Sequence, residues 1–178
     1  MLQSNREIQT MPASNETLAD AADALCRRVE AELPDVVCSL ISVDEEGRLH
    51  PVAGPSLPQE MCKAFDGLSV GPMVGACGTA IYTKRSVEAA DIATDPRWTH
   101  YAALPLKYGL KACWSTPVIG RDGTVFGAFA LYYREVRSHT AREAEVVQGC
   151  VEFCAEAMER HRDEAAVPEC AFAHARRA

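Results

Sequence analysis

Residues 109–133 read GLKACWSTPVIGRDGTVFGAFALYY and contain two apolar runs separated by a turn. The turn, Gly120-Arg121-Asp122-Gly123, places Asp-Gly between segments rich in aromatic and β-branched residues. This pattern is a strong signal for a β-hairpin. Neither face of either predicted strand is plainly polar, so both faces must be covered. We therefore expect the hairpin to lie at the centre of a sheet with helices behind it and further structure in front.

Helices are predicted at both ends of the chain. From residue 15 or 16 to about Leu33, apolar residues recur at three- and four-residue spacing until Pro34 ends the pattern. Thr140-Ala141-Arg142-Glu143 matches a capping box and begins a second helix of about twenty residues. We expect residues 15–162 to form one domain, with flexible ends at residues 1–14 and 163–178.

Shorter elements are predicted between these helices. Residues 36–43 and 48–53 form a second expected hairpin, and residues 86–90 a further strand. Asp95-Pro96 predicts a capped turn that carries Trp98 and Tyr101. Short helices are expected at residues 58–65, 75–82 and 104–108.

Composition argues against several classes of function. The net charge is −7, whereas a nucleic-acid-binding face needs clustered Lys and Arg. No run of 18 apolar residues occurs and the first residues lack the apolar centre of a secretory signal, so we expect a cytoplasmic protein without a membrane partner. The eight cysteines contain no C-x-x-C pair, and we interpret them as small buried side chains instead of metal ligands.

Residues 75–118 read GACGTAIYTKRSVEAADIATDPRWTHYAALPLKYGLKACWSTPV. The predicted strand DGTVFGAFALYY follows them. Together these segments resemble the GAF domains of bacterial signal-transduction proteins, and the resemblance extends over about residues 18–160. It implies an α+β fold in α/β/α layers, with a central antiparallel sheet of five to six strands. The terminal helices would pack together on one face, and residues 54–109 would enclose a ligand pocket on the other.

The helix expected to begin at Gly75 suggests a ligand site. Glycines at its entry let the backbone approach a guest, and a helix start presents unpaired N–H groups that favour a small anion. Aromatic rings would wall the site and threonines would supply hydroxyl groups. The predicted ligand-binding residues are Gly75, Ala76, Cys77, Thr79, Trp98, Tyr101, Trp114 and Thr116, with Phe129 as a further wall. The alternative is that Trp114 and Phe129 belong to the ordinary core.

The resemblance includes small stand-alone GAF proteins that are nitrate receptors. It implies a sensor that binds a small molecule or nitrate-like anion and modulates a partner such as a histidine kinase. No effector domain is expected after the GAF segment. A ligand-free adaptor that contacts other proteins is an alternative.

An enzyme is a second alternative, because Gly75-Ala76-Cys77-Gly78-Thr79-Ala80 resembles the motif of free methionine-(R)-sulfoxide reductases. Cys77 would then be the catalytic thiol. Those enzymes have another cysteine about ten residues upstream of the motif, near Gly67 here, and this chain has none there. We therefore predict no catalytic residue and no enzyme activity.

Cofactors are not implied by the sequence. Haem would need an axial histidine, and His100, which lies in the appropriate loop, is more typical of a surface residue. A bilin would need a cysteine such as Cys77 or Cys113 for its thioether, and nothing else in the chain supports that chromophore. A metal site is not predicted.

The terminal helices suggest a homodimer in which two copies form a four-helix bundle. The alternative is that their apolar residues only cover the sheet. The residues that motivate the homodimer are Val29, Leu33, Val147, Val151 and Met158.

Overall fold

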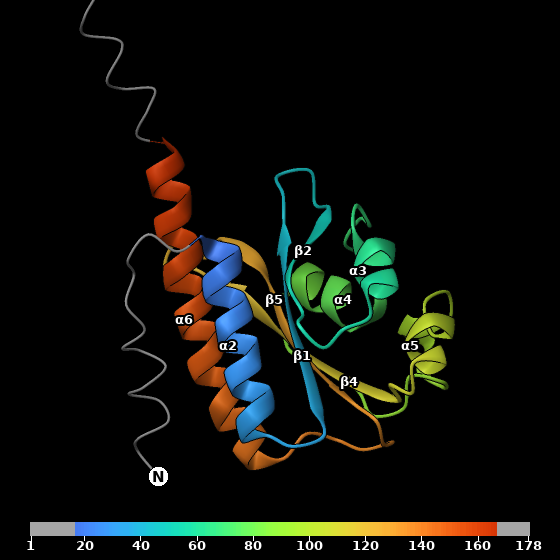
Figure 1. Cartoon of the computed structure of the whole chain (residues 1–178). Coiled ribbons are helices and arrows are strands. Elements are labelled where there is room, and N and C mark those ends of the chain that lie inside the picture. The colour runs from blue at the N-terminus through green and yellow to red at the C-terminus, as the bar shows by residue number, and fades with distance from the viewer. Residues whose placement is uncertain (1–16, 167–178) are drawn as a thin grey trace, which may run out of the picture.

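The computed structural model describes residues 17–166 and has a five-stranded antiparallel sheet at its centre (Figure 1). The strand order is β2-β1-β5-β4-β3. The strands are β1 (Val36–Val43), β2 (Leu49–Ala53), β3 (Val87–Ala89), β4 (Ala112–Ile119) and β5 (Val125–Tyr133). The predicted α+β fold with a central antiparallel sheet is confirmed.

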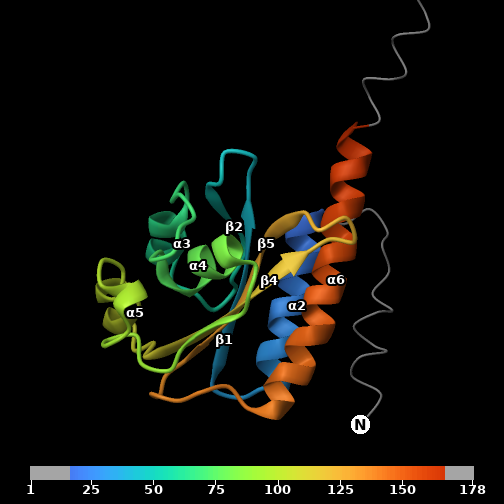
Figure 2. The ribbon, with the colours of Figure 1, turned by 180° about the vertical axis from the view of Figure 1, so that it is seen from behind.

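Helices cover both faces of this sheet (Figures 1 and 2). The two long helices, α2 (Leu18–Glu32) and α6 (Ala141–Ala166), pack side by side on one face, which we call the helix face. The other face, which we call the pocket face, carries only short helices. These are α3 (Gln59–Phe65), α4 (Gly75–Thr83), the 3-10 helix η1 (Pro96–Trp98) and α5 (Ala103–Lys107).

The central hairpin consists of β4 and β5, and β5 also pairs with β1. Gly127 in β5 must be glycine, because a Cβ atom there would lie 2.0 Å from the carbonyl oxygen of Ile41 on β1. Strand β5 is buried on both faces over most of its length. The prediction of a hairpin inside the sheet is thus confirmed.

Capping boxes begin both long helices. Thr17 Oγ1 accepts the N–H of Asp20 at 3.2 Å, and the Asp20 carboxylate accepts the N–H of Thr17. In α6, Thr140 N–H donates to Glu143 Oε2 at 2.7 Å and Glu143 N–H donates to Thr140 Oγ1 at 3.2 Å. These bonds satisfy N–H groups that a helix start otherwise leaves without acceptors.

Helix α6 is longer than predicted, because it continues to Ala166. Residues 163–166, expected in a flexible tail, are therefore helical. Two features support the added turn. The Arg162 side chain bonds Asp122 of the β4–β5 turn and the neighbouring Asp163, each at 3.2 Å. The helix also ends in two alanines, and alanine has the highest helix propensity of all residues. The other residues predicted to be flexible, 1–14 and 167–178, lie outside the described part of the chain.

Alternation along the strands decides which core each side chain joins. Phe129, Leu131 and Tyr133 of β5 pack in one continuous core with α2 and α6. Ala130 and Tyr132 point to the pocket face and pack among residues of the short helices. The bulky residues of β5 thus mainly fill the helix face, whereas small alanines on the other side leave room above the sheet.

The residues that motivated the homodimer prediction are mostly inside the protein. Val29, Leu33, Val147 and Met158 are all buried in the helix-face core, and Val151 is only partly buried against it. The first four therefore cover the sheet of their own chain. The homodimer itself stays a prediction.

Candidate functional site

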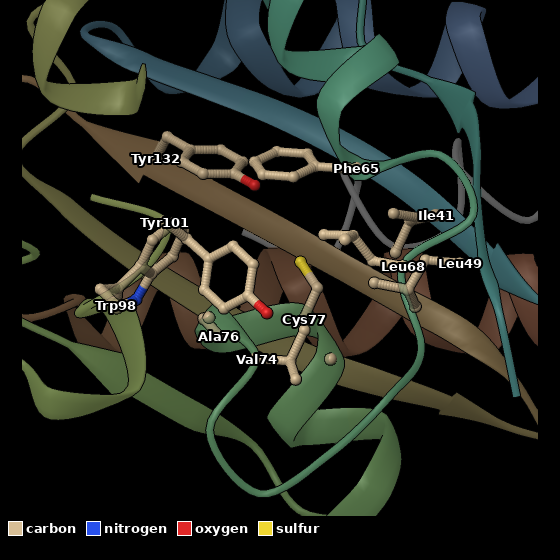
Figure 3. Close-up of a pocket in the computed structure, with 12 residues that line it drawn as sticks. Ile41, Leu49, Phe65, Leu68, Val74, Ala76, Cys77, Trp98, Tyr101 and Tyr132 are labelled. Atoms are coloured by element: carbon tan, nitrogen blue, oxygen red, sulfur yellow. The ribbon is translucent and has the colours of Figure 1, made fainter. Parts of the chain in front are cut away.

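A small, partly open cavity lies on the pocket face between α4, the sheet and the segment that follows η1 (Figure 3). Its volume is about 20 Å³, which leaves room for a guest about the size of one water molecule. The wall is formed mainly by apolar and aromatic side chains, and no charged residue contributes to it. The lining residues are Ile41, Leu49, Phe65, Leu68, Val74, Gly75, Ala76, Cys77, Gly78, Trp98, Tyr101 and Tyr132.

The start of helix α4 forms one side of the cavity. Gly75 has a φ of +55°, a left-handed conformation that L side chains rarely adopt, and it packs against the Trp98 ring. Val74 N–H donates to Thr79 Oγ1 at 3.3 Å, whereas the N-cap residue Val74 itself provides no side-chain hydrogen bond to the helix start. The first-turn N–H groups lack intrahelical acceptors and carry partial positive charge. This end of α4 therefore offers donors toward a guest.

Trp98 forms the opposite side and is held by the short helix η1. Asp95 Oδ1 accepts the N–H of Arg97 at 2.9 Å, and Arg97 Nη2 donates to the backbone oxygen of Glu88 on β3 at 2.6 Å. The Trp98 side chain is 2% exposed. These contacts fix the turn that places the indole over the cavity.

The indole N–H of Trp98 is a buried donor for which no atom of residues 17–166 is an acceptor. Figure 3 shows the nitrogen on the side of the ring toward Ala76 and Tyr101. Burying a donor without an acceptor costs about 1–3 kcal/mol. A guest that presents an acceptor atom to Trp98 Nε1 would offset this cost.

A thiol and a phenol complete the floor of the cavity. Ser115 Oγ donates to Cys77 Sγ at 3.3 Å. Desolvation raises the pKa of the Cys77 thiol, although hydrogen bonds with Ser115 and Tyr132 oppose this effect. Desolvation likewise raises the pKa of Tyr132. Both groups are therefore neutral near pH 7, and the thiolate needed for nucleophilic chemistry is disfavoured.

The comparisons with known proteins agree with this architecture. A family model described as GAF domain matches residues 15–159. The chain belongs to the GAF domain family. The resemblance to GAF domains that was inferred from the sequence is thus confirmed.

A curated relative of this GAF domain is the methyl sulfide methyltransferase-associated sensor of Methanosarcina acetivorans. It is 33% identical over 149 residues, which cover 83% of this chain and 15% of the relative. The chain therefore spans less than a sixth of that protein's length.

Solved structures also share the fold. The GAF domain of a phosphoenolpyruvate-protein phosphotransferase from Coxiella burnetii has a TM-score of 0.75 and 20% identity, covering 93% of this chain and 94% of that one. The type II free methionine-R-sulfoxide reductase of Thermoplasma acidophilum has a TM-score of 0.64 and 14% identity. The match covers 81% of this chain and 96% of that one. At these identities the similarity shows the fold alone.

Of the residues predicted to bind ligand, five line the cavity of the GAF domain. These are Gly75, Ala76, Cys77, Trp98 and Tyr101. Whether they bind a ligand stays a prediction. Thr79 is instead buried in α4, where its hydroxyl accepts the N–H of Val74 and acts as a local cap.

Trp114 and Thr116 do not line the cavity, and their placement in its wall is wrong. Trp114 belongs to the helix-face core, where its ring stacks on His139 with centroids 3.8 Å apart. Thr116, two residues on along β4, lies on the same strand face and its Oγ1 is 3.0 Å from Ser86 Oγ. Phe129 is also in the helix-face core, as in the alternative interpretation.

Several lining residues of the GAF domain were missed. Tyr132 had a usable signal, because Ala128 and Ala130 share its strand face and small side chains leave space there. Phe65, Leu68 and Val74 had none, since they come from a short helix and an irregular loop whose path no periodic pattern encodes.

The remaining candidate groups lie apart from the cavity. His100 is exposed and its ring contacts the edge of Tyr101, with centroids 6.4 Å apart. Within residues 17–166, no group of three or more His, Cys, Asp or Glu residues is arranged to hold a metal ion. No helix in that range is both long and apolar enough to cross a membrane.

Proposed function

We propose that this GAF domain is a sensor in a signal-transduction system, and that its ligand places a hydrogen-bond acceptor against Trp98 Nε1. The observation that carries the proposal is the buried indole N–H without an acceptor at the edge of an apolar cavity. Apolar pockets with a few convergent polar groups are typical small-molecule sites. The Methanosarcina relative, a sensor by name, supports the signalling role.

The chemistry of the wall favours an uncharged guest. An ion in an apolar cavity needs an opposite charge or several hydrogen bonds, and no Lys or Arg lines this one. A neutral molecule needs only the indole N–H and the first amides of α4. Nitrate, the anion predicted from the sequence, is the alternative, and the partial positive charge at the start of α4 is the feature that supports it.

Binding must change the packing around the cavity, because about 20 Å³ admits little more than one water. A ligand shifts a conformational equilibrium only by its different affinities for the two states. We propose that the rearranged pocket face alters α6 and hence a partner such as a histidine kinase in the cytoplasm. In this proposal the sensor unit is the predicted GAF domain, with boundaries near residues 15 and 162.

The reductase alternative is less well supported. The structural similarity to a free methionine-R-sulfoxide reductase and the motif around Cys77 favour it. The raised pKa of Cys77 opposes it, because the thiolate is the nucleophile in cysteine chemistry. Thioredoxin-dependent reduction of free methionine sulfoxide that is lost in Cys77→Ser would support the enzyme and contradict the sensor.

Trp98→Phe tests the sensor proposal, with acetonitrile as a slender neutral acceptor and nitrate as the anion. In ¹⁵N-labelled protein, acetonitrile should shift the Trp98 indole N–H resonance, and affinity measured from other resonances should fall about 2–10-fold in Trp98→Phe. Trp114→Phe is the matched control, because that indole lies on the other face of the sheet. A larger response to nitrate would favour the anion, and no response to either probe would contradict the proposal.

A further inference from the structure

A second cavity adjoins the first beneath helix α3. Its volume is about 10 Å³, and its far end is closed by Pro51, Ala53 and Leu57. It lies in the same apolar layer on the pocket face. Neither cavity alone holds more than a water-sized guest, yet the two are neighbours.

The two cavities share four lining residues, namely Ile41, Phe65, Cys77 and Tyr132. Ile41 and Tyr132 are fixed in the ladders of β1 and β5, and Cys77 lies in α4. Figure 3 shows the Phe65 ring beside the Tyr132 ring, reaching in from α3. The shared residues therefore form a partition, and Phe65 is the member that the sheet does not hold.

Phe65 is placed so that its ring could turn toward solvent. It is the last residue of a seven-residue helix, and its side chain is only partly buried. The next residues leave the helix, with Asp66 in an extended conformation and Gly67 at a φ of +80°. A rotation of the ring toward solvent would join the cavities without disturbing a strand ladder.

We infer that the two cavities are halves of one ligand site and that Phe65 is the movable partition between them. The guest carries its acceptor at Trp98 and an unbranched apolar tail that passes between Phe65 and Tyr132 toward Leu57. This inference rests on the proposed function for the acceptor end only. Each CH₂ group buried in the second cavity tightens binding about fourfold, which favours displacement of the ring.

Alkyl nitriles of increasing length test this inference, because they keep one acceptor and vary only the tail. The proteins are the wild type, Phe65→Ala and the control Met61→Ala. Met61 is a fully buried residue of the same helix that lines neither cavity. Phe65→Leu replaces Phe65→Ala if the alanine variant does not fold.

Acetonitrile should bind all three proteins with affinities within about twofold. Heptanenitrile should bind Phe65→Ala at least tenfold more tightly than wild type or Met61→Ala, because the cost of moving the ring is absent. In the wild type, heptanenitrile should shift the Leu57 methyl resonances, whereas acetonitrile should shift the Trp98 indole resonance and leave the Leu57 methyl resonances unchanged.

The outcomes separate the two proposals. If acetonitrile shifts Trp98 but heptanenitrile neither reaches Leu57 nor prefers Phe65→Ala, the partition is wrong and the proposed function stands. If heptanenitrile reaches Leu57 with the expected preference but Trp98 never responds, the partition stands and the acceptor site is wrong. If neither resonance responds in any protein, both are wrong.

Discussion

The two faces of the sheet are packed in different ways. On the helix face, one continuous core runs from α2 through β1, β4 and β5 to α6. On the pocket face, the buried residues form two separate clusters, two small cavities remain, and one buried donor has no acceptor in the described chain. The helix face provides close packing for stability, whereas the pocket face keeps features that cost stability unless a guest binds.

The largest expected effect compares two buried leucines, one on each face. Leu131 is fully buried in the helix-face core, and Leu110 is 2% exposed in a pocket-face cluster. Leu131→Ala should lower the free energy of unfolding by about 3–5 kcal/mol, because two long helices and the sheet cannot close around the void. Leu110→Ala should cost only about 2–3 kcal/mol, because short helices relax more easily.

Urea denaturation of both variants measures this difference. Similar denaturant slopes would show that only stability has changed. A cost for Leu110→Ala equal to or above that for Leu131→Ala would contradict the view that the pocket face is the more adaptable side.

A smaller effect is expected where the two faces are joined. His139 lies just before α6, and its ring stacks on Trp114. The Glu88 carboxylate accepts the backbone N–H of His139 at 3.0 Å and also bonds the His139 ring. The backbone oxygen of Glu88 accepts from Arg97, next to Trp98. Strand β3 therefore connects the turn above the cavity with the start of α6.

Glu88→Gln keeps the shape of the side chain but removes its charge. It should cost about 1 kcal/mol, because the carboxylate is partly exposed and its bonds to His139 are weakened instead of lost. Hydrogen exchange in the first turns of α6 should rise. Glu60→Gln is the control, since Glu60 bonds Lys107 and Tyr108 within the pocket face. Faster exchange in α6 from the control alone would contradict the connection through β3.

The same contrast explains what could be predicted from the sequence. The β4–β5 hairpin follows from Asp-Gly at its turn, and α2 follows from its apolar period. The capping box predicts the start of α6, and the glycine-rich entry predicts the start of α4. Strand alternation places Trp114 and Thr116 on the same face of β4, but it does not say which face of the strand lines the cavity. The small residues Ala128 and Ala130 mark that side.

Residues brought together only by the tertiary fold could not be predicted. Phe65 and Leu68 reach the cavity from a short helix and the loop after it, and the direction of that loop depends on contacts distant in sequence. Leu49 N–H, for example, donates to the backbone oxygen of Leu68 at 2.8 Å. Local propensity contains no information on such a contact.

The smallest effect is expected at the rim of the pocket face, where His50 joins the β1–β2 turn to the end of α3. Its Nε2 is 2.8 Å from Asp44 Oδ2, and its Nδ1 is 2.9 Å from Asp66 Oδ1. Ionised carboxylates only accept hydrogen bonds, so the ring can donate to both of them only as an imidazolium. The bonds to Asp44 and then Asp66 raise the pKa of His50. Arg48, two residues before His50, donates to the backbone oxygen of Gly67.

The raised pKa fixes the sign of the pH dependence. The contribution of His50 to stability is fully present below its unfolded pKa of about 6.5 and is lost as the pH rises through the higher folded value. The stability advantage of wild type over His50→Asn should therefore shrink in urea midpoints as the pH rises above about 6.5. His100→Asn, at an exposed histidine beside Tyr101, is the matched control. An advantage that instead grows with pH would mean that neutral His50 is the favoured form. The position of the loop that runs from Asp66 to Leu68 at the cavity would then not depend on an ion pair with protonated His50.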